Sequence, residues 1–404
     1  MKKVFTLAAL GLLTAASFSA QAQAPITVDG QITATEAVAS GYQLVGRRLG
    51  ASPATRGFGD AGLLSVYAAA DANNLYFFVA GTLQVNADVL QNSIQMFIDR
   101  PGVDGVPIGT ALPLPAAATA PAVNTSFEKM GAKLDLAADI AIAVSRNDVA
   151  GQAKVDGVVY TPTTATAVVA TSLPGGAPLN ITTGAAYNTP ATLAAPFGGF
   201  ANASVAYRTS ANLSSNPGYN GGAAASIGNA PANGFEIRVS RTAMGIPTAG
   251  GQLRIFVVQN NQDGGFLSSD FIPQGGFVSS TTNAGANPDF TSAAFPGTQA
   301  ATLNVTATGL TVITSTKSAA IANALKFNVF PNPAAGAATV SYTVPGQQEV
   351  SVEVFNALGQ RVRSLASGRQ GGLQQQNLSD LASGAYFVKL QVGGQSTSQK
   401  LIVQ

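Results

Sequence analysis

An acidic loop is the first candidate for metal chemistry in this sequence. Asp99 and Asp104 enclose a short segment that contains a proline and a glycine and follows an alternating apolar run. Two carboxylates and nearby main-chain carbonyls are the kind of oxygen ligands that Ca²⁺ prefers. The spacing does not match an EF-hand loop, which needs acids at alternate positions and a glutamate at the twelfth. Calcium binding and a plain polar turn therefore both remain open, here and at Asp263, which precedes a Gly-Gly pair.

Other chemistry is restricted by the residue types that the chain lacks. The sequence contains no Cys and no His, which excludes zinc-thiolate sites and a Ser-His-Asp triad. A glycosidase would need two carboxylates about 5–10 Å apart. The glutamates between residues 23 and 316 are Glu36, Glu128 and Glu236. Because Glu236 lies within an alternating segment, we expect it to face solvent or to pair with Arg238 or Arg254. No catalytic residues are predicted, and a glycosidase is the remote alternative.

Composition favours an extracellular, β-rich protein. Only 10% of the 404 residues are charged, against about 25% in an average soluble protein, and 44 residues are glycine. This length allows two or three domains. The formal net charge of +2 gives no indication of nucleic-acid binding.

The first 22 residues have the pattern of a secretory signal peptide. Lys2 and Lys3 precede an uncharged apolar run, which ends in the small-x-small sequence of residues 20–22. The apolar run is shorter than the ~20 residues that a membrane-spanning helix needs. We therefore expect cleavage after Ala22 and no transmembrane segment.

The last 80 residues, 325–404, are predicted to form a separate small sandwich behind a linker at 317–324. Alternation of apolar and polar residues predicts five short strands, at 338–344, 349–355, 361–366, 385–391 and 397–403. Turn residues stand between them, among them Pro345-Gly346 and Gly371-Gly372. Short strands at this spacing are typical of an Ig-like antiparallel sandwich.

Four motifs in this region occur in a characteristic order. They include the residues Pro331, Asn332, Pro333, Gly359, Gly384, Tyr386 and Lys400. The region resembles the type A C-terminal sorting domain of the type IX secretion system of Gram-negative Bacteroidota. That resemblance implies passage through the periplasm, engagement of the type IX machinery and export across the outer membrane. It also implies removal of this domain on arrival, with the product on the cell surface or in the medium.

Residues 23–316 are predicted to be the exported cargo. A hairpin of strands 64–70 and 75–81 has apolar residues on both faces, which indicates a central strand covered on both sides. Further strands are predicted at 93–99, 134–144, 155–161, 234–240, 253–258, 301–305 and 310–313. The stretches 107–121 and 170–233, rich in Ala, Gly, Thr and Asn, are expected to be long loops.

This cargo resembles the family 9 carbohydrate-binding-module-like sandwich. The resemblance rests on the order of the segments 26–30, 71–76, 93–99, 234–237 and 263–264, and it implies two packed antiparallel sheets. Sugar sites of that family rely on tryptophan, which this chain lacks. Tyrosine can also stack on a sugar ring, and the candidates are Tyr42, Tyr67, Tyr160, Tyr187, Tyr207 and Tyr219. The alternative is that these rings pack in the core or under loops.

Together these patterns predict an all-β, exported, non-catalytic protein with a structural or adhesive role. The alternative is a glycan-binding module with an extracellular polysaccharide as its partner. No cofactor is expected apart from structural calcium at Asp99, Asp104 or Asp263.

Overall fold

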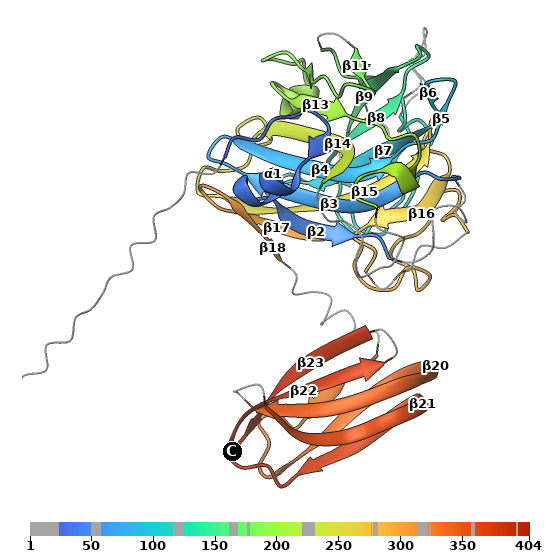
Figure 1. Cartoon of the computed structure of the whole chain (residues 1–404). Helices are drawn as coiled ribbons and strands as arrows, with labels where there is room; N and C mark the ends of the chain where they lie inside the picture. The colour runs from blue at the N-terminus through green and yellow to red at the C-terminus, as the bar shows by residue number, and fades with distance from the viewer. Residues whose placement is uncertain are drawn as a thin grey trace, which may run out of the picture.

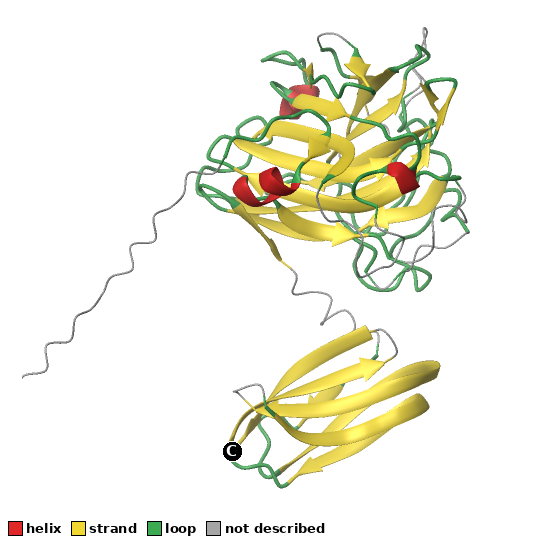
Figure 2. Ribbon diagram, viewed as in Figure 1, coloured by secondary structure: helices red, strands yellow, loops and turns green. Residues whose placement is uncertain are grey.

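Strands dominate the computed structural model of the chain, as the alternating sequence patterns predicted (Figure 1 and Figure 2). The structure describes residues 24–49, 58–115, 125–160, 169–175, 178–219, 231–275, 277, 282–313, 322, 325–356, 360–392 and 395–404. The predicted signal peptide, residues 1–22, lies outside these ranges, as does all of the predicted linker except Ala322. Within the described ranges, no helix has the length and apolar character needed to cross a membrane.

The first sheet has seven antiparallel strands in the order β12-β13-β14-β4-β3-β2, with β1 paired to β14. Their bounds are β1 Gln31–Ile32, β2 Gln43–Arg47, β3 Gly62–Ala70, β4 Asn74–Thr82, β12 Tyr187–Asn188, β13 Ser204–Tyr207 and β14 Ala232–Ser240. The predicted hairpin is confirmed as β3 and β4. Asp71 closes its turn by accepting hydrogen bonds from the main-chain N–H groups of Asn73 and Asn74, each at 2.7 Å. Every residue of β4 after Asn74 is buried, as expected for a strand covered on both faces.

The second sheet has nine strands, in the order β10-β9-β8-β7-β15-β17-β18 with β11 on β9 and β16 on β15. Their bounds are β7 Asn92–Asp99, β8 Ile140–Arg146, β9 Gln152–Val159, β10 Val169–Ser172, β11 Leu179–Asn180, β15 Gly251–Asn261, β16 Leu267–Ile272, β17 Ala301–Val305 and β18 Leu310–Ile313. Shorter elements outside the two sheets are α1 Ala34–Ala39, η2 Phe197–Phe200, η3 Leu213–Ser215, β5 Val85–Asn86 and β6 Val89–Leu90.

The two sheets pack face to face around a central core. Phe77 and Val79 of β4 belong to this core together with Ile94 and Met96 of β7 and Ile255 of β15. Alternate residues of each strand point inward, so the period-two pattern of the sequence supplies both inner faces. The expected architecture of two packed antiparallel sheets is confirmed.

Each sheet also carries a second core on its outer face. On the first sheet this core includes Tyr76 and Phe78, with Ile26 and Ala37 packed against it, so the N-terminal segment and α1 cover the sheet (Figure 1). On the second sheet the outer core is rich in phenylalanine: Phe97, Phe127, Phe256, Phe271, Phe290 and Phe295. Loops between the strands cover it. The sequence patterns predicted that the β3–β4 hairpin is covered on both faces, but they did not show which segments cover it, and they did not predict the phenylalanine-rich layer on the second sheet.

Several sequence expectations for the cargo differ from the structure. The stretch 170–233, expected to be long loops, contains the strands β11, β12 and β13. The strand expected at 134–144 begins only at Ile140, because Leu134 and Leu136 instead pack into the outer core of the second sheet. Helix α1 was not predicted, although its capping box of Thr33 and Glu36 is visible in the sequence.

The C-terminal residues form a five-stranded sheet with its own core. Its strands are β19 Asn328–Phe330, β20 Ala337–Asn356, β21 Arg361–Ser379, β22 Gly384–Val392 and β23 Gln395–Val403. The turns predicted at Pro345-Gly346 and Gly371-Gly372 are wrong, because β20 and β21 each run through them as one long hairpin (Figure 1). The first part of β20 pairs with β19 and the last part with β22. A shift of register between Val344 and Gln348 separates the two parts.

The core of this module shows why one long hairpin stands where three short strands were predicted. Val340 and Tyr342 from the first part of β20 are buried in the same cluster as Val352 and Val354 from the last part. The two parts of the hairpin therefore contribute apolar side chains to one core. The Pro-Gly and Gly-Gly pairs lie at an irregularity within the strands and do not end them.

Candidate functional site

The Pro331-Asn332-Pro333 motif fastens the start of the C-terminal module to its end. The Asn332 side chain donates from Nδ2 to the main-chain oxygen of Lys400 at 2.7 Å, and its Oδ1 accepts from the N–H of Ile402 at 3.0 Å. The flanking prolines are exposed and hold φ fixed on either side of Asn332. One side-chain amide thus pairs with β23 as a neighbouring strand would.

The two Asn332 side-chain bonds to β23 act as a clamp, and main-chain hydrogen bonds between the same segments complete it. The N–H of Ala334 donates to the main-chain oxygen of Ile402 at 2.8 Å, and the N–H of Gln404 donates to the main-chain oxygen of Ala334 at 2.9 Å. The Lys400 side chain is exposed, so its main chain holds the clamp while its ammonium group faces solvent. Clamp and motif coincide, which indicates that the motif specifies the fold of this module.

The remaining motif residues lie on the adjoining strands. Gly384 is the ladder partner of Val403, and Tyr386 donates from its hydroxyl to the main-chain oxygen of Ala382 at 2.8 Å. Tyr386 is also the ladder partner of Asn356, which closes the turn after β20 by pairing with Gln360. Gly359 lies outside the described residues. Motifs far apart in the sequence therefore meet across β20, β22 and β23.

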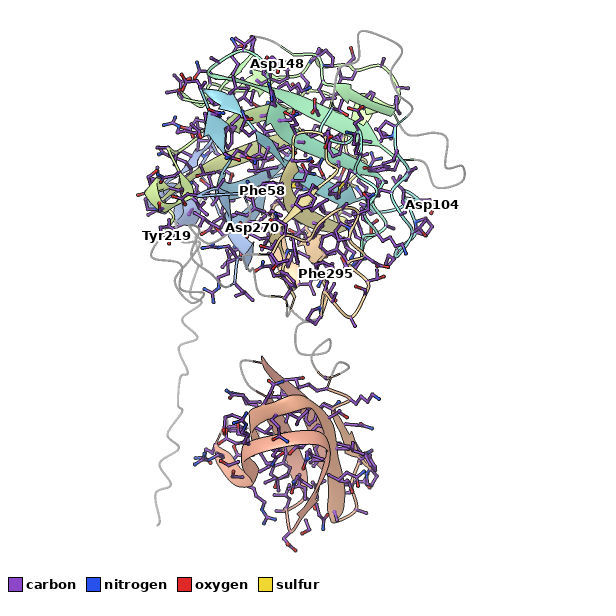
Figure 3. The ribbon with its side chains drawn as sticks, turned by 90° about the vertical axis from the view of Figure 1, so that its right-hand side faces the viewer. Phe58, Asp104, Asp148, Tyr219, Asp270 and Phe295 are labelled. Carbon is purple, nitrogen blue, oxygen red and sulfur yellow. The ribbon has the colours of Figure 1, made fainter. Side chains whose placement is uncertain are left out.

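Asp99 and Asp104 line one polar pocket of about 400 Å³ in the large sandwich. Burial raises the pKa of Asp99, although the neighbouring Arg254 guanidinium acts in the opposite direction. Asp104 is exposed at the surface of the molecule, far from Asp148 in Figure 3. Calcium takes six to eight oxygen ligands. In the described part of the chain no group of three or more acidic residues is placed to hold a metal ion, so calcium at this loop stays a prediction.

Asp263 lies at the other end of the same sheet. It follows β15 at Asn261, whereas Asp99 pairs with Arg254 near the beginning of that strand. Its carboxylate forms an ion pair with Lys129 at 2.7 Å and accepts from the N–H of Gly265 at 2.9 Å. Burial raises the pKa of Asp263, but the hydrogen bonds from Lys129 and Gly265 outweigh burial and hold the pKa below its usual value. The three aspartates considered for calcium do not form a common site.

Glu236 is fully buried, so the expectation of a solvent-facing or arginine-paired side chain was wrong. Its carboxylate accepts hydrogen bonds from the main-chain N–H of Asp29 at 2.9 Å, of Gly30 at 3.0 Å and from the Tyr42 hydroxyl at 3.0 Å. Burial raises the pKa of Glu236 to about 8, although these donors act to lower it. Because β14 lies inside its sheet and the N-terminal segment covers its outer face, the alternating pattern alone gave the wrong environment.

Most of the tyrosines considered for sugar stacking belong to the packed interior. Tyr42 and Tyr67 lie in the outer core of the first sheet, Tyr160 in that of the second, and Tyr207 in the central core. Tyr187 is partly buried against the central core, and Tyr219 (Figure 3) against the outer core of the first sheet. The rings are spread over three cores, which fits the packing interpretation of these residues.

Residues 328–404 match the family of secretion system C-terminal sorting domains. This part of the chain is therefore a type IX C-terminal sorting domain, as its motifs predicted. Such a tail marks a protein for the type IX machinery, and hence for export to the cell surface or the medium. No curated protein matches the chain.

Three solved structures resemble parts of the chain at low identity. Dimeric latent PorU from Porphyromonas gingivalis is 14% identical with a TM-score of 0.19, over 90% of this chain and 34% of that chain. The CupB2 chaperone from Pseudomonas aeruginosa is 11% identical with a TM-score of 0.15, over 44% of this chain and 72% of that one. The BSP domain of a biofilm-associated protein is 7% identical with a TM-score of 0.17, over 94% and 53% respectively. The chain thus spans about one third of the PorU chain.

Proposed function

We propose that the large sandwich acts outside the cell as a non-catalytic structural or adhesive protein. The signal peptide takes the chain to the periplasm, the sorting domain takes it across the outer membrane, and the tail is removed on arrival. The observation that carries this proposal is the role of the buried acids. Catalytic carboxylates must reach a substrate, whereas these acids hold the sandwich together.

Three buried aspartates illustrate this structural use. Asp139 accepts from the N–H of Arg100 at 2.6 Å and also forms an ion pair with its side chain. Asp156 accepts from the N–H of Ser126 at 2.9 Å, and Asp270 from the N–H of Leu63 at 3.1 Å. Each carboxylate fixes a loop or a strand end by satisfying main-chain donors that would otherwise be costly to bury. Together with Glu236, these acids support a stable scaffold that presents its loops.

Export and role are tested separately. In a host with the type IX system, the full chain should reach the cell surface or medium, whereas a chain lacking residues 325–404 should stay in the periplasm. Cells that lack the protein should attach less to surfaces or to one another, and the full chain should restore attachment. A hydrolytic activity of the purified protein that disappears when acids are replaced would refute the non-catalytic role.

A further inference from the structure

The pocket beside Asp99 contains a row of polar side chains on three neighbouring strands. Arg254 of β15 is the ladder partner of Asp99 in β7 on one side and of Thr302 in β17 on the other. Paired residues of adjacent strands lie about 5 Å apart on the same face of a sheet. Leu253 and Ile255 point into the central core, so Arg254 points outward with its two partners. A carboxylate, a guanidinium and a hydroxyl therefore stand side by side.

The walls of this pocket are held in place before any ligand arrives. The loop after β7 forms one wall, and Arg100 anchors it through bonds from N and Nε to Asp139 at 2.6 and 2.5 Å. Arg254 is itself oriented, because its Nη2 donates to the main-chain oxygen of Asp135 at 2.6 Å. Gln252, two residues before Arg254 and thus on the same face, extends the polar lining. Ordered walls reduce the entropy that binding must overcome.

The charges of the pocket select against strongly charged ligands. Asp139 neutralises Arg100, which leaves Arg254 among the carboxylates of Asp99 and Asp104. An anion would be repelled by these two carboxylates, and a cation would be repelled by the Arg254 guanidinium. An apolar ligand would bury polar groups without partners, which is unfavourable. A neutral ligand with several hydroxyl groups can donate to the carboxylates, accept from Arg254 and do both with Thr302.

We propose that this pocket binds a neutral sugar residue through its hydroxyl groups. Its volume of about 400 Å³ lies within the usual size of a small-molecule site, roughly 300–1,000 Å³. The binding mode differs from ring stacking, since hydrogen bonds from Asp99, Arg254 and Thr302 replace aromatic contacts. The site does not depend on the structural role proposed above, but a scaffold with such a pocket could attach to a polysaccharide.

The test uses the purified full chain and four separate probes: glucose, galactose, mannose and N-acetylglucosamine. Saturation-transfer NMR should detect binding of at least one of them. Arg254→Gln and the near-isosteric Thr302→Val should each weaken it, by about tenfold or more for Arg254→Gln because a bond from a charged donor is lost. Arg146→Gln is the matched control, because Arg146 bonds to Asp148 and Gln262 at the other end of the sheet.

Several outcomes would overturn the sugar site. They are absence of binding for all four sugars, binding that Arg254→Gln and Thr302→Val leave unchanged, and binding of CaCl₂ alone that Asp99→Asn abolishes while no sugar binds. Circular dichroism shows whether each variant is folded, and Thr302→Val decides the matter if Arg254→Gln unfolds. If the natural chain supports attachment but binds none of the four sugars, the sugar site alone is refuted. If the natural chain binds a sugar but cells that lack the protein attach normally, the adhesive role is refuted.

Discussion

The buried carboxyl of Glu236 predicts that the large sandwich loses stability as pH rises. The folded chain holds the proton of Glu236 up to about pH 8, whereas the unfolded chain releases it near the ordinary value of 4.5. Between these values the unfolded state binds fewer protons, so stability is greatest below pH 4.5 and falls through pH 8. Each tenfold difference in proton affinity corresponds to about 1.4 kcal/mol. The free energy of unfolding should therefore fall by about 3 kcal/mol from pH 4.5 to pH 7 and by about 5 kcal/mol in all.

Glu236→Gln isolates this contribution. Glutamine keeps the size and one acceptor oxygen for the N–H groups of Asp29 and Gly30, and the Tyr42 hydroxyl can turn to accept from the new amide. Because it cannot ionise, the variant should lose much less stability than the natural chain between pH 5 and pH 9. The chain has no tryptophan, so urea unfolding is followed by circular dichroism at pH 5, 7 and 9.

A matched control and a clear refutation exist for this experiment. Glu128→Gln makes the same chemical change in a loop that covers the second sheet, and its pH profile should follow that of the natural chain. Other groups whose pKa burial raises, such as Asp139, remain in every variant and cancel in the comparison. If Glu236→Gln and the natural chain have parallel profiles, Glu236 titrates near its ordinary value and the reasoning is refuted.

Three further substitutions test the packing and the clamp. Asn332→Ala removes two side-chain bonds to β23, so the C-terminal module should lose about 1–2 kcal/mol; an unchanged thermal transition of this module would show that the clamp is dispensable. Phe290→Ala empties part of the phenylalanine-rich core, where its ring centroid lies 4.7, 4.9 and 5.0 Å from the centroids of three other rings, and should cost about 3–5 kcal/mol in urea unfolding. A loss below 1 kcal/mol would mean that the covering loops collapse into the space. A methyl group at Gly105 would lie 2.1 Å from the main-chain oxygen of Ala137, so Gly105→Ala should lower the melting temperature of the large sandwich, and an equal or higher melting temperature would contradict this close packing.

Local sequence patterns were enough to predict much of the strand content and the C-terminal export signal of this protein. Alternation located the β3–β4 hairpin, where Asp71 supplies the turn chemistry, and seven further strands of the large sandwich, among them β7, β14 and β15. The order of the C-terminal motifs identified the sorting domain before any contact was known, because such motifs are short and contiguous. Patterns with a period of two show which residues share a face of a strand. They do not show what will cover that face.

Tertiary structure alone decided the environments of the polar groups. Glu236 is buried because a segment some 200 residues earlier covers its strand, and Asp99, Arg254 and Thr302 meet because β7, β15 and β17 happen to be neighbours. The Pro-Gly pair at 345 lies inside a strand because β19 and β22 pair with β20 on either side of it. Strand order and register are set by contacts between residues far apart in the sequence, and a local pattern contains no information about those partners.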